Sequence, residues 1–230
     1  MLTLLAALAI GVPADTVTFT GDVGFVNTSG NTELTTINVG NKLGMTAGGW
    51  SVAQTFGLIY GTSQGETTTS LWRGALRGDR SLAARVGVYV LSEFDRNTFA
   101  GIGSRYAESA GLAAKLMVAD RDKLDAEVGV GYVWQNASGD GADQEFSAGR
   151  AALIYTHALG EKAMVGQTLE FLPNLKTSDD LRINAETALT APISAGISMK
   201  AGYVIRYDGL PEPGFRKTDR ILTTGLQVTF

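Results

Sequence analysis

The residue best suited to acid–base chemistry in this chain is a single histidine. His157 is the only histidine among 230 residues, and the chain has no cysteine. A histidine activates a serine for hydrolysis only when the hydroxyl lies within hydrogen-bonding reach, and no serine is predicted beside it. We interpret His157 as a turn residue, predict that the chain is not an enzyme, and keep lipid hydrolysis as a remote alternative. The lack of cysteine excludes disulfide bonds and thiolate chemistry.

A second group of residues faintly resembles a calcium loop. The stretch NASGDGADQE, residues 136–145, contains Asp140, Asp143 and Glu145 together with two glycines. Their spacing does not match the full set of EF-hand ligands. We interpret the stretch as a solvated loop, with divalent ions that bridge it to anionic lipopolysaccharide as the alternative. No cofactor and no metal are expected.

The largest group of charged residues follows a period of two. In LDAEVGVGYVW, residues 124–134, one face carries Val128, Val130 and Trp134, and the opposite face carries Asp125 and Glu127. This alternation is typical of β-strands with two unlike faces. Charged side chains of this kind are therefore expected to gather on one side of a sheet.

The same alternation runs through most of the chain after residue 15. The segments are near the 9–11 residues that a tilted strand needs to cross a bilayer, and all five prolines are expected to lie outside them. The predicted strands are, roughly, 16–27, 34–46, 50–61, 68–78, 83–94, 104–117, 123–135, 145–156, 162–171, 180–191, 197–207 and 218–230.

The connections between these segments alternate in length. One set is short, such as AGG and DRSL, and the other is mostly longer and more polar, such as DRNTFAGIG and DGLPEPGFRK. Outer-membrane barrels have short periplasmic turns and long extracellular loops. We therefore predict an all-β fold: a closed antiparallel up-and-down transmembrane β-barrel of about 12 strands.

The two faces of the strands reverse the rule for soluble proteins, since charges occupy the face that should point inward. The predicted lumen-lining residues are Lys42, Arg73, Arg77, Arg85, Glu93, Asp95, Arg105, Lys115, Glu127, Arg150, Glu170, Arg182, Glu186, Lys200 and Arg206. The apolar face carries aromatic residues near the segment ends, as in the girdles of membrane barrels. The predicted girdle consists of Trp50, Tyr60, Tyr132, Trp134, Tyr155, Tyr203 and Tyr207.

Basic and acidic residues nearly balance on the predicted lumen face. Interspersed charges of both signs favour ion pairs that cross a narrow lumen, whereas a lining of one sign would favour a selective pore. A barrel of about twelve strands lies between filled small barrels and open porins. A small-solute channel therefore remains an equal alternative.

The two ends of the chain carry separate signals. Residues 2–14 are LTLLAALAIGVPA, without charge and too short to span a bilayer as a helix. We predict that residues 1–14 are the remnant of a signal peptide and that residues 15–230 form the barrel. The last residue, Phe230, ends a strand and is predicted to be the signal for the outer-membrane assembly machinery.

Two amides do not fit the apolar face. Asn41 and Gln54 fall among Leu43 and Phe56 on the predicted outer side, where an amide without a partner costs roughly 2–7 kcal/mol. A tight turn at Gly48–Gly49 would make the two amides diagonal neighbours. We predict either a hydrogen bond between them or contact of this patch with a partner, with a homo-oligomer as the second case.

Three motifs are similar to those of a known family. They are GDVGFVNTSGNTE at 21–33, FDRNTFAGIGSRY at 94–106 and KTDRILTTGLQVTF at 217–230. The chain resembles the salt-induced outer membrane protein family, also called YdiY-like, a domain-of-unknown-function family. The resemblance implies a bacterial outer-membrane β-barrel and transfers no catalytic residue.

Composition narrows the expected partners. The chain is 44% hydrophobic and 18% charged, with a net charge of -4, so it lacks the basic face that nucleic-acid binding requires. Outer-membrane lipids and lipopolysaccharide are the expected surroundings. We expect a structural or envelope-stress role in the outer membrane, with a porin-like channel as the alternative.

Overall fold

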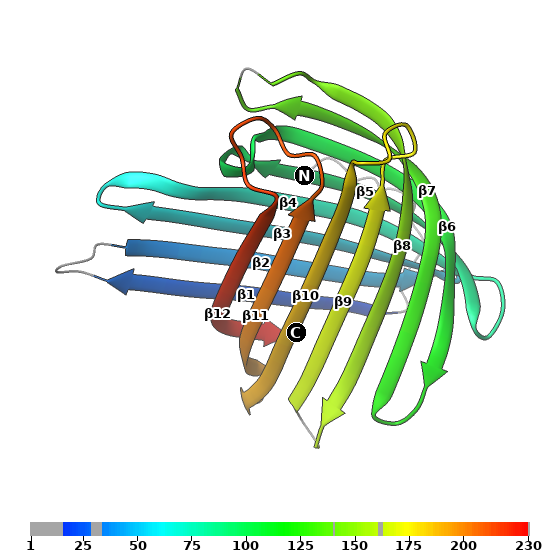
Figure 1. The fold of residues 1–230 in the computed structure, drawn as a ribbon. Helices are drawn as coiled ribbons and strands as arrows, with labels where there is room; N and C mark the ends of the chain where they lie inside the picture. Colours follow the sequence, from blue (N-terminus) through cyan, green and yellow to red (C-terminus); the bar gives the residue numbers. More distant parts are fainter. Residues whose placement is uncertain (1–15, 29–33, 140, 161–162, 230) are drawn as a thin grey trace.

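The fold is a closed barrel of twelve antiparallel strands (Figure 1). It is seen in a computed structural model, which describes residues 16–28, 34–139, 141–160 and 163–229. Each strand pairs with the next along the chain, and β1 pairs with β12. The predicted fold class is confirmed. The predicted signal segment 1–14 and Phe230 lie outside the described residues.

The strands follow the alternating segments of the sequence closely. Among the described residues, one short 3-10 helix, Thr98–Ala100, follows β5. No helix in these residues is long and apolar enough to cross a membrane. The strands are β1 (Thr16–Thr28), β2 (Leu34–Ala47), β3 (Trp50–Ser63), β4 (Glu66–Ser81), β5 (Val86–Asn97), β6 (Ile102–Val118), β7 (Asp122–Ala137), β8 (Gln144–Leu159), β9 (Ala163–Pro173), β10 (Leu181–Ser194), β11 (Ile197–Asp208) and β12 (Thr218–Thr229).

Connections sort to the two ends of the barrel, which we call the short-turn end and the long-loop end. Gly48 and Gly49 both have positive φ and join β2 to β3 at the short-turn end. This turn pairs Thr46 with Ser51, as the sequence predicted. At the long-loop end, β3 and β4 extend further than expected. Gln64 and Gly65, both with positive φ, join them as a two-residue hairpin, because such a turn matches the twist of the strands.

The predicted positions of three residues, Arg85, Pro173 and Pro192, are wrong. Arg85 was expected on a strand and in the lumen, but residues 82–85 form the turn between β4 and β5, and its side chain is exposed. The amides of Leu82 and Ala83 both donate to the carbonyl of Val86 and close this turn. Pro173 ends β9 and Pro192 lies inside β10. A register shift between residues 192 and 194 accommodates Pro192 at the irregular end of its ladder.

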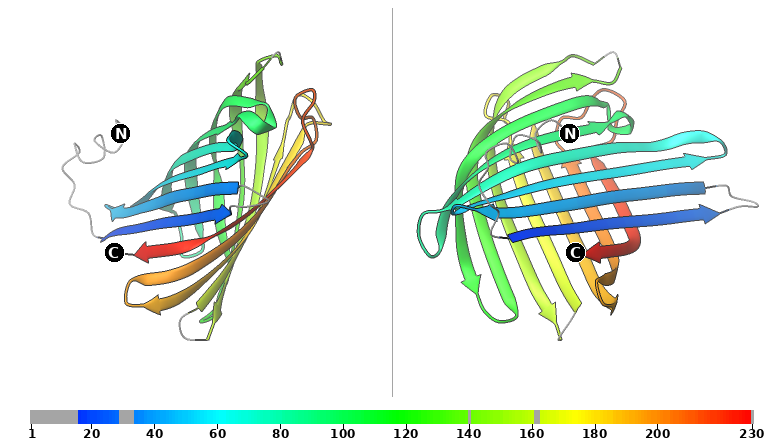
Figure 2. Two further views of the ribbon diagram at one scale, coloured as in Figure 1. Left: turned by 90° about the vertical axis from the view of Figure 1, so that its left-hand side faces the viewer. Right: turned by 180° about the vertical axis from the view of Figure 1, so that it is seen from behind.

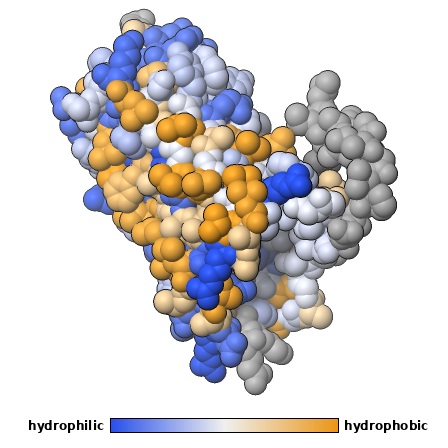
Figure 3. Space-filling model, turned by 90° about the vertical axis from the view of Figure 1, so that its right-hand side faces the viewer, coloured by the Kyte–Doolittle hydropathy of each residue, from blue (hydrophilic) through white to orange (hydrophobic). Residues whose placement is uncertain are grey.

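The outer surface of the barrel is apolar. Large apolar residues on the strands are exposed there: the exposed fraction is 65% for Val130 and 73% for Leu222. Figure 3 shows hydrophobic residues across the middle of one face and hydrophilic residues at its two ends. Few of the described hydrophobic residues are buried. One cluster of them consists of Val133, Phe146 and Ala148. The faces are therefore inverted relative to a soluble β-protein.

Asn41 and Gln54 are joined as the sequence predicted. The Gln54 side-chain amide donates to Asn41 Oδ1 at 3.5 Å, across the ladder that sets Asn41 opposite Phe56. The hydrogen bond satisfies one donor and one acceptor on the apolar outer face. The structure thus contains the first of the two predicted arrangements.

Replacing both Asn41 and Gln54 with leucine should leave folding intact or improve it, because the hydrogen bond is long and both groups would leave an apolar surface. The measurement is the melting temperature of the purified barrel in detergent, with gel migration of the unheated sample as a check of assembly. A double variant that folds but loses a native oligomer would identify the patch as an interface instead.

The seam between the first and last strands is short. β1 pairs with β12 over four positions, from Thr20–Thr229 to Val23–Leu226, and then diverges from it (Figure 2). At the point of divergence a side chain on Gly24 would collide with the carbonyl oxygen of Thr224. Glycine is therefore required at position 24, where the backbones of β1 and β12 come close together.

Cysteine pairs provide a test of this seam, since the chain has no cysteine of its own. Asp22→Cys with Gln227→Cys occupies a paired position within the range of disulfide geometry and should crosslink readily under mild oxidation. Phe25→Cys with Thr224→Cys lies just beyond the ladder and should crosslink more slowly. Equal rates for the two pairs, measured on non-reducing gels, would show that the strands pair further than the structure indicates.

Candidate functional site: the charged lumen

A cavity of about 760 Å³ occupies the barrel interior. Most of the predicted lumen residues line it, whereas Arg77 and Glu127 join the ion pairs beside it. Lys115 is exposed near the short-turn end, opposite Asp125, and does not line the cavity. The predicted residues that line the cavity are Lys42, Arg73, Glu93, Asp95, Arg105, Arg150, Glu170, Arg182, Glu186, Lys200 and Arg206.

Buried ion pairs surround one tyrosine in the lumen. We call Arg77, Tyr89, Glu127, Arg150 and Glu170 the Tyr89 cluster. Glu127 contacts Arg77 at 2.7 Å and Arg150 at 2.6 Å. Arg150 also contacts Glu170 at 2.8 Å. The ion-paired residues come from β4, β7, β8 and β9 and Tyr89 from β5, so the pair between β4 and β7 crosses two intervening strands.

Tyr89 lies at the centre of this cluster and was not identified from the sequence. Its side chain is 1% exposed, and its ring lies 4.7 Å from the Arg77 guanidinium carbon and 5.1 Å from that of Arg150. A side chain on Gly111 or Gly129 would collide with Tyr89. The ring therefore packs against bare backbone on β6 and β7. The sequence did contain a signal that Tyr89 faces the lumen: it lies four residues before Glu93, on the same face of the strand.

A second group of ion pairs lies closer to the long-loop end. Asp95 on β5 contacts Arg206 on β11 at 3.3 Å and Arg73 on β4 at 3.5 Å. Arg105 on β6 contacts Asp208 on β11 at 3.6 Å. β5 and β11 stand on opposite sides of the closed strand order. The Asp95–Arg206 and Arg105–Asp208 pairs therefore join opposite walls of the barrel, whereas Arg73 and Asp95 are neighbours on the β4–β5 ladder.

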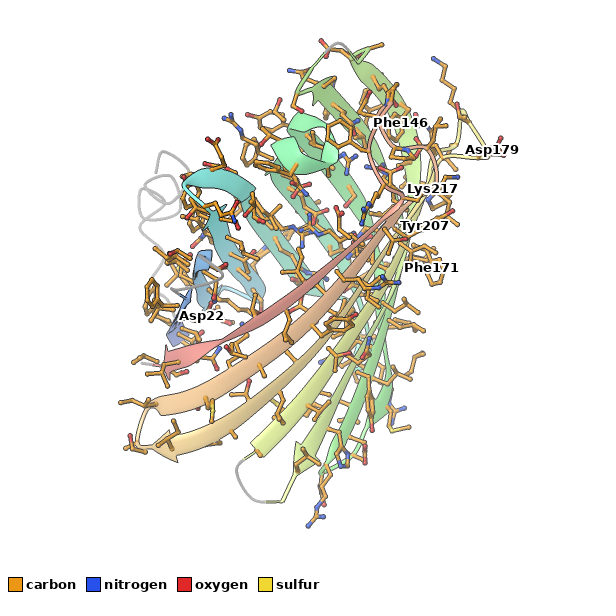
Figure 4. The ribbon with its side chains drawn as sticks, turned by 60° about the vertical axis from the view of Figure 1, so that its left-hand side comes forward. Asp22, Phe146, Phe171, Asp179, Tyr207 and Lys217 are labelled. Atoms are coloured by element: carbon orange, nitrogen blue, oxygen red, sulfur yellow. The ribbon has the colours of Figure 1, made fainter. Side chains whose placement is uncertain are left out.

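The remaining inward charges are distributed along the cavity. Lys200 contacts Asp22 at 3.3 Å, and Figure 4 shows Asp22 on the opposite side from Phe146 and Lys217. Lys42 and Glu186 line the cavity without an ion pair among the described residues. Arg182 is 5% exposed and packs over the Phe146 ring at 5.0 Å.

The loop between β11 and β12, residues 209–217, reaches across the long-loop end. Glu212 is 8% exposed and accepts hydrogen bonds from the side-chain amides of Gln135 on β7 and Gln144 on β8. β7 and β8 are far from β12 in the strand order. This loop contact was not predicted, because nothing in a loop sequence specifies which strand it meets.

The residues weighed for catalysis and metal binding have other partners. His157 lies on β8 rather than in a turn, and its Nδ1 is 2.8 Å from Asp122 Oδ1. Asp143 accepts a hydrogen bond from the Ala137 amide. Glu145 accepts a hydrogen bond from Tyr132, and Asp140 lies outside the described residues. These three described groups do not converge on one site.

Aromatic residues of the predicted girdle lie on the outer face near the strand ends. Trp50, at the short-turn end, packs against Arg80 with 5.4 Å between ring centre and guanidinium. The Tyr132 and Trp134 rings are 4.8 Å apart, and Tyr155 donates to Asp122. Tyr60 contacts Thr67. Tyr203 is exposed, and Tyr207 lies in one outward row with Phe171 across β10 (Figure 4).

Structural comparison gives outer-membrane barrels. The NanC porin matches with a TM-score of 0.53 and 12% identity, over 92% of this chain and 98% of that one. The KdgM porin matches at 0.46 and 8%, over 94% and 99%. The translocator domain of the autotransporter NalP from Neisseria meningitidis matches at 0.45 and 14%, over 99% and 93%. At this identity the NanC likeness shows the fold alone.

Sequence comparison identifies one family. No curated protein matches the chain. One family model, described as "Protein of unknown function, DUF481", matches residues 21–230, which covers nearly all of the barrel and includes the motifs at 21–33, 94–106 and 217–230. The chain therefore belongs to the DUF481 family.

Proposed function

We propose that this chain is a bacterial outer-membrane barrel with a structural or envelope-stress role, and that its lumen conducts little at rest. The observation that supports this most directly is the set of ion pairs between non-adjacent strands. Asp95 and Arg206 join opposite walls at 3.3 Å. A side-chain pair can bridge opposite walls only where the lumen is narrow.

The outer face supports the membrane location. Large apolar side chains cover it, with aromatic residues near both ends, as lipid and its interfaces require. Closure pairs the backbone groups that hydrocarbon cannot satisfy. We infer that the short-turn end faces the periplasm and the long-loop end faces lipopolysaccharide. The resemblance to salt-induced outer membrane proteins supports the envelope-stress role, and the assembly machinery is the proposed folding partner.

Conductance in planar bilayers tests the resting state. The purified wild type should give little steady current, because charged pairs block the lumen. Large stable steps in the absence of any trigger would contradict the proposal. A lipase assay with detergent-dispersed phospholipid tests the accompanying proposal that the chain has no hydrolytic activity.

A small-solute or ion channel is the second candidate. It is favoured by the cavity of about 760 Å³, which is lined by side chains of both signs. This candidate requires the ion pairs to part, so conductance should appear at high ionic strength or under applied voltage. Absence of current under both conditions would leave the structural role.

The closed barrel itself predicts heat-modifiable behaviour. The unheated protein should migrate anomalously on denaturing gels and unfold only on boiling, because every strand has two neighbours and unfolding must break a closed ladder. Circular dichroism should show β-structure in detergent. A helical spectrum, or full solubility without detergent, would contradict the membrane barrel.

A further inference from the structure

Arg182 is a buried cation in the wall of the cavity. Its side chain is 5% exposed, and its Nε is sealed from solvent without a hydrogen-bond acceptor. Among the described residues it makes no ion pair within 4.0 Å, and its packing contact is the Phe146 ring. A buried charge without a partner is costly, so this guanidinium is suited to an anionic group that enters the cavity.

The carboxylates nearest to Arg182 along the chain and across the ladder are engaged by other groups. Asp180 accepts a hydrogen bond from Asn174 at 2.7 Å. Asp208, which faces Arg182 across the β10–β11 ladder, contacts Arg105 at 3.6 Å and accepts the Leu210 amide at 3.0 Å. Neither acid therefore makes a direct ion pair with Arg182.

Other arginines increase the local positive charge. Arg105 lies close enough to Arg182 for the two charges to repel each other, and the same holds for Arg206 and Arg73. Asp95 is shared by Arg73 and Arg206, and the Nε of Arg206 has no acceptor. All four arginines line the cavity. Together they form an arginine cluster with two ion-paired carboxylates, Asp95 and Asp208.

Arg182 packs over the ring of Phe146, with 5.0 Å between its guanidinium carbon and the ring centre. The N–H groups of a guanidinium match the two oxygens of a carboxylate. Arg182 is the second residue of β10, at the long-loop end and above the Tyr89 cluster. A ligand that enters from the long-loop side would therefore pass the loop 209–217, which also lines the cavity, and not the Tyr89 cluster.

We propose that the cavity binds a small organic carboxylate, with its carboxyl group on Arg182 and Arg105. This inference does not depend on whether the lumen conducts. The cavity of about 760 Å³ lies within the range of small-molecule sites. Asn184 also lines the cavity; its Nδ2 donates to Glu170 at 2.9 Å, and its Oδ1 can accept from the remainder of the ligand.

Gluconate and sorbitol test the proposal as a matched pair of ligands, since they share a carbon skeleton and differ in the carboxylate. Calorimetric titration of the detergent-solubilised barrel at constant ionic strength should show binding of gluconate and none of sorbitol. Sorbitol that binds as tightly as gluconate, or gluconate that does not bind, would overturn the proposal. Phosphate that binds as tightly as gluconate would overturn the assignment to a carboxylate.

Arg182→Gln should weaken gluconate binding about tenfold or more, as expected for the loss of a charge-assisted hydrogen bond. Arg85→Gln removes the same charge from the exposed turn at the other end and should leave binding unchanged. Gel migration of the unheated samples shows that both variants are folded. If Arg182→Gln is folded and binds gluconate as the wild type does, the site is elsewhere; if it does not fold, the gluconate–sorbitol comparison still decides.

Discussion

Replacing Glu127 with glutamine should destabilise the barrel by about 3 kcal/mol, the low end of the range for removing one partner of a buried ion pair. Glu127 is 9% exposed and contacts both Arg77 and Arg150. Each arginine keeps a second carboxylate, Asp79 for Arg77 and Glu170 for Arg150. These remaining pairs are the reason to expect the low end of the range.

Glu186→Gln is the matched control for this change. Glu186 also lines the cavity, is exposed to it, and forms no ion pair among the described residues. The control should change stability by no more than about 0.5 kcal/mol. Urea unfolding in detergent, followed by tryptophan fluorescence, measures both. Equal effects of the two variants would mean that the Glu127 ion pairs contribute nothing specific to stability.

The strands and much of their register could be predicted because both depend on local signals. Alternation of apolar and charged residues identifies a strand and its two faces. The glycines at 48–49 fix a tight turn, and that turn fixes the neighbours of Asn41 and Gln54. A pairing between adjacent strands therefore follows from one turn and a period of two.

Contacts across the lumen could not be predicted in this way. Which carboxylate meets Arg206 depends on the stagger accumulated around the whole barrel, and the structure joins it to Asp95 on the opposite wall. Arg85 has the parity of an inward residue, but the turn lies at residues 82–85, three residues later than the predicted strands 68–78 and 83–94 place it. Lys115 lies at a register shift between residues 115 and 117. At such a shift the alternation of residues along the strand no longer predicts which face a side chain is on.

Tyr89 shows a further limit of pattern analysis. An aromatic residue near a strand end suggests a girdle position, but this ring faces inward and fills the space above Gly111 and Gly129. The two glycines lie on β6 and β7, the strands that follow β5. Their small size becomes informative only once the register places them beside the ring. Burial of this tyrosine between two arginines is therefore a property of the assembled barrel.

Replacing Tyr89 with alanine should open a conducting path through the lumen. The ring is almost wholly buried, packs on backbone at Gly111 and Gly129, and contacts the guanidinium groups of Arg77 and Arg150. Its removal leaves a space that those two long, charged side chains can enter, and water can follow. Steady bilayer conductance should rise at least several-fold above that of the wild type.

Two further variants separate loss of the ring from general damage to the barrel. Tyr89→Phe keeps the ring and should stay closed, while Tyr203→Ala removes an exposed tyrosine from the outer face and should not affect current. Tyr89→Ala is also expected to cost about 3–5 kcal/mol through the lost packing, so gel migration must show that it is folded before current is compared. If the folded alanine variant conducts no more than the wild type, the blockage lies elsewhere. The Asp95–Arg206 and Arg105–Asp208 pairs would then be the layer that closes the lumen, because they tie β5 and β6 to β11 on the opposite wall.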